Sequence, residues 1–170
     1  MTDDKDFVLI GFLLLSVFGR MLLVSCMFIG EYSHSIDPKR RVAMPSRFRT
    51  ELGSRVVVTR GLDSSLFVYP MKVWEELAAK LGSLPIGEAA TRSFTRLQLA
   101  GATDVELDSQ GRVLIPDYLK DSAGLKKNVV VVGLYNRLEI WDEAKWKSYK
   151  AGAEKNAGKI AEDLGKLGVY

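Results

Sequence analysis

The sequence has a single cysteine and a single histidine, and this scarcity excludes several kinds of site. Cys26 has no second cysteine for an intramolecular disulfide, so the fold does not depend on an oxidising compartment, which indicates the cytoplasm. His34 has no cluster of possible metal ligands at suitable spacing, so a histidine within a strand is favoured over a metal site. The usual glycine-rich phosphate loops are absent, and no carboxylates stand out as an acid and base pair. We therefore expect no catalytic residues, no metal, no cofactor and no small-molecule substrate.

The charge balance leaves the partner open. Hydrophobic residues make up 47% of the 170 residues and charged residues 26%, which is typical of a globular protein. The net charge of +3 permits a nucleic-acid partner without requiring one.

One short motif occurs twice: a strand, then D-x-x-x-R, then a second short strand and a proline. The copies span residues 36–45 and 107–116, and a shift of 71 residues places Asp108 on Asp37 and Arg112 on Arg41. A shift of 72 then continues the match as far as Trp146 on Trp74. A unit this small buries too little surface to be stable alone, so the two copies should pack together as one domain.

The patterns divide the chain into five segments. These are an apolar extension (1–26), a first unit with its helix (27–81), a linking helix (82–101), a second unit with its helix (102–149) and a tail (150–170). Strands are expected at 31–36, 42–44, 56–59 and 66–69, and at 104–107, 113–115, 129–132 and 138–141. Helices are expected at 46–52, 71–81, 88–101 and 118–123, and one further helix should begin at Asp142 as its N-cap. Glycines weaken the helical pattern of the tail, for which we expect frayed or partner-dependent structure.

Residues 1–26 differ from the rest because they are largely apolar after an acidic start. Spanning a bilayer takes about 20 apolar residues, and the acidic start is unlike that of a signal peptide. Three interpretations are open: a functional protein that begins at Met27, a membrane anchor, and a buried or oligomer-contacting helix. We favour the first.

Three further motifs carry a resemblance. They are G-E-Y-x-H-x-I-D at 30–37, R-G-L-D-x-x-L-F-V-Y-P-x-x-x-W at 60–74 and G-x-x-N-R-L-E-I-W at 133–141. Together with the tandem units they resemble the MraZ family over residues 27 to about 149. The resemblance implies an α+β, β-rich fold of two AbrB-like ββαβ units, each a swapped hairpin, related by pseudo-twofold symmetry and joined by helices. It also implies a DNA-binding transcriptional regulator of the division and cell-wall gene cluster. Such a regulator would bind double-stranded DNA at short direct repeats as a ring homo-oligomer and would be nucleoid-associated.

The first motif is the candidate DNA site. Its turn presents Lys39, Arg40 and Arg41, while Asp37 can position the turn by accepting backbone N–H groups or pairing with an arginine. Arginine suits phosphates and the edge of guanine. An isolated D-x-x-x-R is more often an ion pair that closes the turn, and the resemblance is what favours DNA contact by Lys39 and Arg41. With Arg40 and Arg47, these are the candidate DNA-binding residues.

Charge separates the two copies. Residues 28–60 carry seven cations and three anions, whereas residues 102–141 carry five cations and six anions. Phosphate neutralisation dominates nucleic-acid affinity, so the first unit is the expected DNA face. Asp108 and Arg112 are then expected to serve structure and oligomer contact.

The first motif departs from the family pattern at Arg40, where a glycine is usual. Glycine tolerates a positive φ and arginine does so only with strain, so either the turn differs or the glycine is not needed. Two other functions stay open: a membrane-tethered protein-interaction module that uses residues 7–26, and an AbrB-like antitoxin whose tail from Lys150 folds on a toxin.

Overall fold

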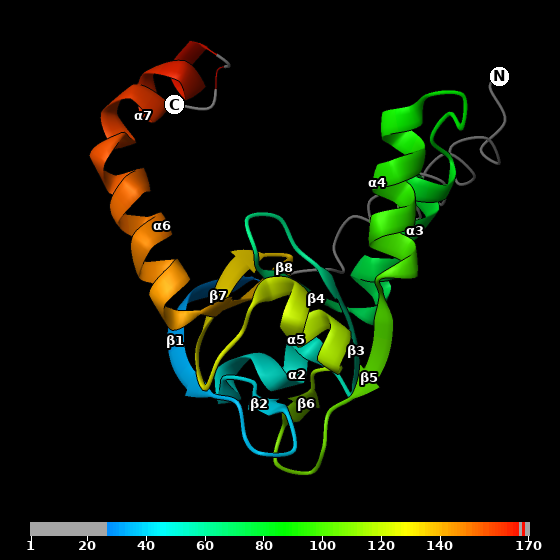
Figure 1. The fold of residues 1–170 in the computed structure, drawn as a ribbon, viewed down its shortest axis with the longest axis vertical. Coiled ribbons are helices and arrows are strands. Elements are labelled where there is room, and N and C mark those ends of the chain that lie inside the picture. The colour runs from blue at the N-terminus through cyan, green and yellow to red at the C-terminus, as the bar shows by residue number, and fades with distance from the viewer. Residues whose placement is uncertain (1–26, 167, 169–170) are drawn as a thin grey trace, which may run out of the picture.

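The computed structural model describes residues 27–166 and 168. It is an α+β structure in which the order of strands and helices in the first half of the chain recurs in the second half (Figure 1). The strands are β1 (Phe28–Ser35), β2 (Arg41–Ala43), β3 (Arg55–Arg60), β4 (Leu66–Pro70), β5 (Thr103–Glu106), β6 (Arg112–Leu114), β7 (Asn128–Tyr135) and β8 (Arg137–Asp142). The helices are η1 (Ser46–Phe48), α2 (Arg49–Leu52), α3 (Met71–Gly82), α4 (Ala89–Ala100), α5 (Asp117–Ala123), α6 (Glu143–Lys155) and α7 (Ala157–Lys166).

Strand pairing crosses between the two repeats. The larger sheet is antiparallel with the order β1-β7-β8-β4-β3-β5. The first strand of each repeat therefore pairs with the third strand of the other, β1 with β7 and β5 with β3. The second short strands of the two motifs, β2 and β6, form a separate antiparallel pair. Each repeat thus supplies strands that the other needs to complete its hydrogen bonding.

One hydrophobic core serves both repeats. Val56 and Val58 of β3 and their counterparts Val129 and Val131 of β7 point into the same cluster, because alternate residues of a strand face the same side. The short helices close it with Phe48 and Leu52 from the first repeat and Leu119 and Ala123 from the second. The expectation that the two units pack together is confirmed.

Two helical arms extend from the sheet. Helices α3 and α4 form one arm and α6 and α7 the other, and both rise at the end of the molecule away from the motif turns (Figure 1). Because of these arms, 43% of the described residues are helical and 31% are in strands, so the fold is less β-rich than the sequence indicated.

The start of the second arm was predicted correctly and its extent was not. The Asp142 carboxylate accepts hydrogen bonds from the backbone N–H groups of Ala144 and Lys145, as an N-cap does. Beyond residue 150, where we expected frayed or partner-dependent structure, the chain stays helical to Lys166 with one break at Asn156. The alanine, lysine and glutamate residues between its glycines favour a helix.

No helix in residues 27–166 is long and apolar enough to cross a membrane. The extension 1–26, on which the membrane-anchor interpretation depends, and Cys26 within it lie outside the described residues.

Candidate nucleic-acid interface

The first motif folds into a tight turn held by one carboxylate. Asp37 Oδ1 accepts hydrogen bonds from the backbone N–H groups of Lys39 (2.8 Å) and Arg41 (2.9 Å). Asp37 Oδ2 accepts one from Arg41 Nε at 2.7 Å. The backbone N–H of Arg40 donates to the Asp37 carbonyl oxygen at 2.8 Å and completes the turn. A short acceptor at the first position is what lets five residues reverse direction between two strands.

The second motif repeats this arrangement bond for bond. Asp108 Oδ1 accepts from the N–H groups of Gln110 (2.9 Å) and Arg112 (3.0 Å), and Oδ2 accepts from Arg112 Nε at 2.7 Å. The backbone N–H of Gly111 donates to the Asp108 carbonyl at 2.7 Å. The two turns therefore share one backbone conformation and differ in the side chains that they present.

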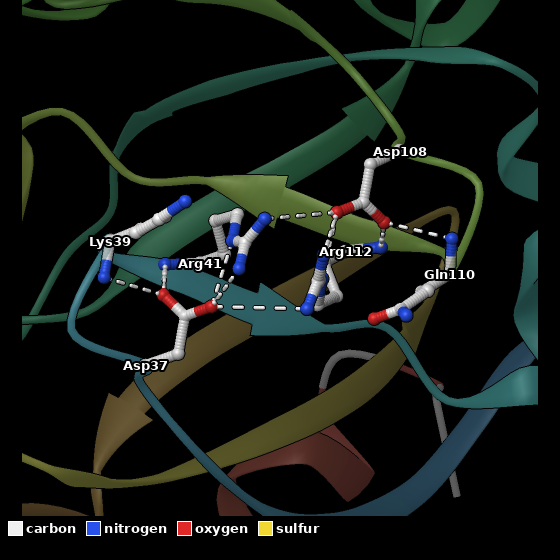
Figure 2. Close-up of polar contacts among 6 residues, drawn as sticks. All are labelled: Asp37, Lys39, Arg41, Asp108, Gln110 and Arg112. Atoms are coloured by element: carbon white, nitrogen blue, oxygen red, sulfur yellow. Dashed lines mark hydrogen bonds and ion pairs between the residues drawn. The ribbon is translucent and has the colours of Figure 1, made fainter.

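Strands β2 and β6 bring the two turns together, and Figure 2 shows their four charged side chains side by side. Besides its own aspartate, each arginine lies near the aspartate of the other repeat. The distance from Arg41 Nη1 to Asp108 Oδ2 is 3.7 Å, and that from Arg112 Nη1 to Asp37 Oδ2 is 3.9 Å. We call Asp37, Arg41, Asp108 and Arg112 the charge quartet.

The quartet changes the acidity of its carboxyl groups. The hydrogen bond from the Arg112 side chain, helped by backbone N–H groups, lowers the pKa of Asp108 to about 2. The corresponding bonds from Arg41 lower the pKa of Asp37. Both carboxylates therefore stay charged wherever the protein is folded near neutral pH, and they keep the two arginines oriented.

Arg40 occupies the position that is glycine in the second turn. Its φ is 63° and that of Gly111 is 72°, so both residues adopt the left-handed conformation. The first turn has the same conformation as the second despite lacking the glycine, which resolves the alternatives that the sequence left open. The Arg40 guanidinium pairs with the Asp117 carboxylate at the start of α5, and both side chains remain partly exposed.

The remaining candidate residues are not all at the same place. Lys39 is exposed at the tip of the first turn. Arg47 is exposed further along the chain, where its Nη1 donates to the Tyr32 hydroxyl at 3.0 Å and its guanidinium lies over the Phe48 ring. Among the contacts of residues 27–166, none links Arg47 to the turn.

Three lysines from the second repeat lie beside the first turn, and the sequence had not indicated them. An open pocket of about 310 Å³ is lined by residues of both, namely Ile36, Asp37, Pro38, Arg40, Lys120, Lys126 and Lys127. The lysines are at least 75 residues from the motif in sequence, so their position depends on the pairing of β1 with β7.

The contacts of the only histidine and of the tryptophans indicate roles in packing. His34 lies in β1, its Nε2 is buried without a hydrogen-bond partner, and burial lowers its pKa, aided by nearby Arg49. No group of three possible metal ligands occurs within the described part of the chain. Trp141 is 3% exposed and packs against Trp146, so neither its position nor its contacts suit stacking on a base.

Comparison with known proteins follows the repeat. A family model described as MraZ protein, antitoxin-like, matches residues 27–97 and again residues 98–166. The chain is 48% identical over 143 residues to a protein of Acetivibrio thermocellus and to one of Halothermothrix orenii. Each match covers 84% of this chain and 100% of the relative. A protein of Moorella thermoacetica is 53% identical over 123 residues, which is 72% of this chain and 86% of that protein. All three are named transcriptional regulator MraZ.

The fold and the paired motif turns define a two-repeat α+β protein whose halves share strands and one core. The family match covers both repeats, and the relatives are similar well beyond the motifs. The chain belongs to the MraZ family. Its named members are regulators and not enzymes.

Proposed function

We propose that this chain is a sequence-specific DNA-binding transcriptional regulator of the division and cell-wall gene cluster. It binds short direct repeats, and it does so as a ring of identical protomers. The observation that carries the proposal is the first motif turn, in which a rigid backbone presents cationic side chains to solvent. The names of the relatives support the regulatory role.

The chemistry of the first turn suits DNA. Lys39 is exposed and Arg40 partly so, on a turn whose shape is held by Asp37. A held turn loses little conformational freedom on binding, so more of the interaction with phosphate or guanine appears as affinity. Arg41 keeps 28% of its side chain exposed while it bonds to Asp37, so it can contact DNA from within the charge quartet.

The second turn is the natural comparison, because it has the same backbone and different tips. Where the first turn has Lys39 and Arg40, the second has Gln110 and Gly111. We propose that the first repeat reads DNA and that Asp108 and Arg112 serve the scaffold and subunit contact. The exchange of first strands between repeats supports an AbrB-like swapped hairpin. A ring would place several first turns on successive repeats, and multivalency would strengthen weak individual contacts.

The test uses the full chain and the DNA upstream of its own gene, with a scrambled duplex for comparison. Lys39→Gln with Arg40→Gly gives these two positions of the first turn the residues that the second turn has, Gln110 and Gly111, on a backbone that already accepts them. We expect wild-type binding to favour the native duplex and to weaken with salt, and we expect the variant to lose this preference. Equal binding to both duplexes by the wild type would refute the proposal.

A second comparison tests the division between repeats. Arg41→Ala and Arg112→Ala remove equivalent members of the charge quartet, so both should lower stability by a similar amount. Only Arg41→Ala should weaken DNA binding strongly once folding and assembly are shown to be intact. Equal losses from both substitutions, with assembly unchanged, would show that both repeats contact DNA.

A second candidate function is an AbrB-like antitoxin, favoured by the exposed apolar side chains of α7. Ile160 is 46% exposed, and it lies on a helix none of whose residues is buried. If this role is correct, co-expression with the product of an adjacent gene should relieve toxicity, and removal of residues 157–170 should abolish that relief. An adjacent gene whose product is harmless by itself would count against it.

A further inference from the structure

The first motif turn is built against the second repeat. The backbone N–H of Ile36, which precedes the turn, donates to the Lys127 carbonyl oxygen at 2.8 Å. On the other side the Arg40 guanidinium pairs with Asp117 of α5, and the Arg40 carbonyl accepts a hydrogen bond from the Ile115 N–H at 2.9 Å. The segment from α5 to β7 is thereby held beside the turn, together with its lysines.

These lysines are free to attract an anion. Lys126 and Lys127 are exposed and Lys120 is half-buried. None of the three forms an ion pair with a described acidic residue. Asp37, the one carboxylate that lines the pocket, is already engaged by Arg41, and Asp117 is engaged by Arg40. The pocket beside the turn is therefore cationic, although its lining includes one aspartate.

The corresponding place beside the second turn has one half-buried cation, Arg49, instead of a group of lysines. There the backbone N–H of Leu107 donates to the Ser54 carbonyl at 2.9 Å, so the uncharged Ser54 stands where Lys127 stands. The counterpart of Lys120 is Arg49, whose Nε donates to the Met44 carbonyl at 3.0 Å. The two turns therefore differ in charge not only in their own residues but also in the residues that surround them.

We propose that Lys120, Lys126 and Lys127 of the second repeat bind the phosphate backbone of the DNA that the first turn reads. This inference rests on the proposed function and names residues that complete its site. Phosphate contacts fix the position of a protein on the duplex, whereas contacts to base edges give the sequence preference. The first repeat supplies the side chains that contact base edges, and the second repeat supplies cations that bind phosphates.

The experiment measures dissociation constants over a series of salt concentrations for the full chain and for Lys120→Gln/Lys126→Gln/Lys127→Gln. A matched control, Lys80→Gln/Lys155→Gln/Lys159→Gln, removes the same charge from helices α3, α6 and α7. These helices form the arms that rise away from the motif turns (Figure 1). Each lost phosphate contact makes the negative slope of the logarithm of the association constant against log salt shallower by about 0.9. We expect the magnitude of the slope to decrease by roughly 2 to 3 for each protomer that contacts the DNA in the test variant, while the control keeps the wild-type slope.

The pattern across duplexes separates this inference from the proposed function. Loss of three phosphate contacts should lower the affinity for the native and the scrambled duplex by the same factor. The preference for the native duplex should then be unchanged. If the wild type prefers its native duplex and the test variant keeps wild-type affinity and slope, the inference is wrong and the proposed function stands. If the wild type shows no preference, both are wrong.

Two controls keep the result interpretable. Circular dichroism and sedimentation must show that the test variant folds and assembles as the wild type does, and Lys127→Gln alone serves if the triple variant does not fold. Inorganic phosphate is then titrated at constant ionic strength. Displacement of DNA from the wild type by millimolar phosphate would identify a site for a free anion and overturn the assignment to DNA.

Discussion

Arg40 shows how one side chain can conflict with the turn that carries it. Its φ of 63° lies in the left-handed region, where a Cβ costs about 1–2 kcal/mol and glycine pays no such cost. The chain keeps an arginine there, pointing at Asp117 and beside the cationic pocket. The position thus exchanges some stability for a charge at the proposed DNA site.

Arg40→Gly and Arg40→Ala should therefore differ. Both lose the pair with Asp117 and the same charge, but only glycine relieves the backbone. We expect the glycine variant to be more stable than the alanine variant by about 1 kcal/mol, measured by urea unfolding. DNA affinity should fall equally in both. An alanine variant as stable as the glycine variant would mean that the turn relaxes away from the positive φ.

At the scale of elements, the pairing of β2 with β6 and the charge quartet above it join the two repeats. The pairing fixes where the turns sit, whereas the lowered pKa values of Asp37 and Asp108 follow from the arginine and the backbone N–H groups of each aspartate's own turn. Local sequence predicted each turn but not the contacts of either arginine with the aspartate of the other repeat.

Acid should weaken the charge quartet, because protonation neutralises its two aspartates. Asp108 has a pKa of about 2 in the folded protein, and the pKa of an unperturbed aspartate in the unfolded chain is 3.8. As pH falls, the unfolded state takes up its proton first, so the quartet's contribution is complete above about pH 4 and is lost toward pH 2. We expect urea midpoints of the wild type to fall with pH across this window.

The comparison for that prediction is Asp37→Asn/Asp108→Asn. This variant is less stable at neutral pH, and its urea midpoint should depend less on pH between 4 and 2. A slope equal to that of the wild type would show that other carboxylates are responsible for the acid sensitivity.

Considered as a whole, the protein is two repeats that cannot be separated. Strands β1 and β5 each belong to one repeat and pair with the other, and a single core contains residues of both. Both repeats therefore contribute to the same buried surface. Neither repeat alone can form the backbone hydrogen bonds of its strand edges or cover its apolar residues.

Unfolding should accordingly be one cooperative transition. At fixed protein concentration, tryptophan fluorescence and far-ultraviolet circular dichroism should give coincident urea curves, because no part of the core can open alone. Residues 27–101 and 102–170 expressed separately should each be unfolded. Two resolved transitions, or a folded half, would contradict the shared core.

Much of this molecule was determined by the sequence alone. The repeat and the D-x-x-x-R turns depend on short-range patterns, as does the start of α6 at Asp142, so those could be predicted from neighbouring residues. Counting charge by repeat assigned the cations of the second repeat to the scaffold. A count along the sequence does not show which of these cations lie beside the first turn in space. Only the tertiary structure decided that Lys126 and Lys127 lie beside the first turn and that Arg41 lies near Asp108. The physical reason is that both placements are made by strands that pair across the repeats, about 70 or more residues apart in the chain.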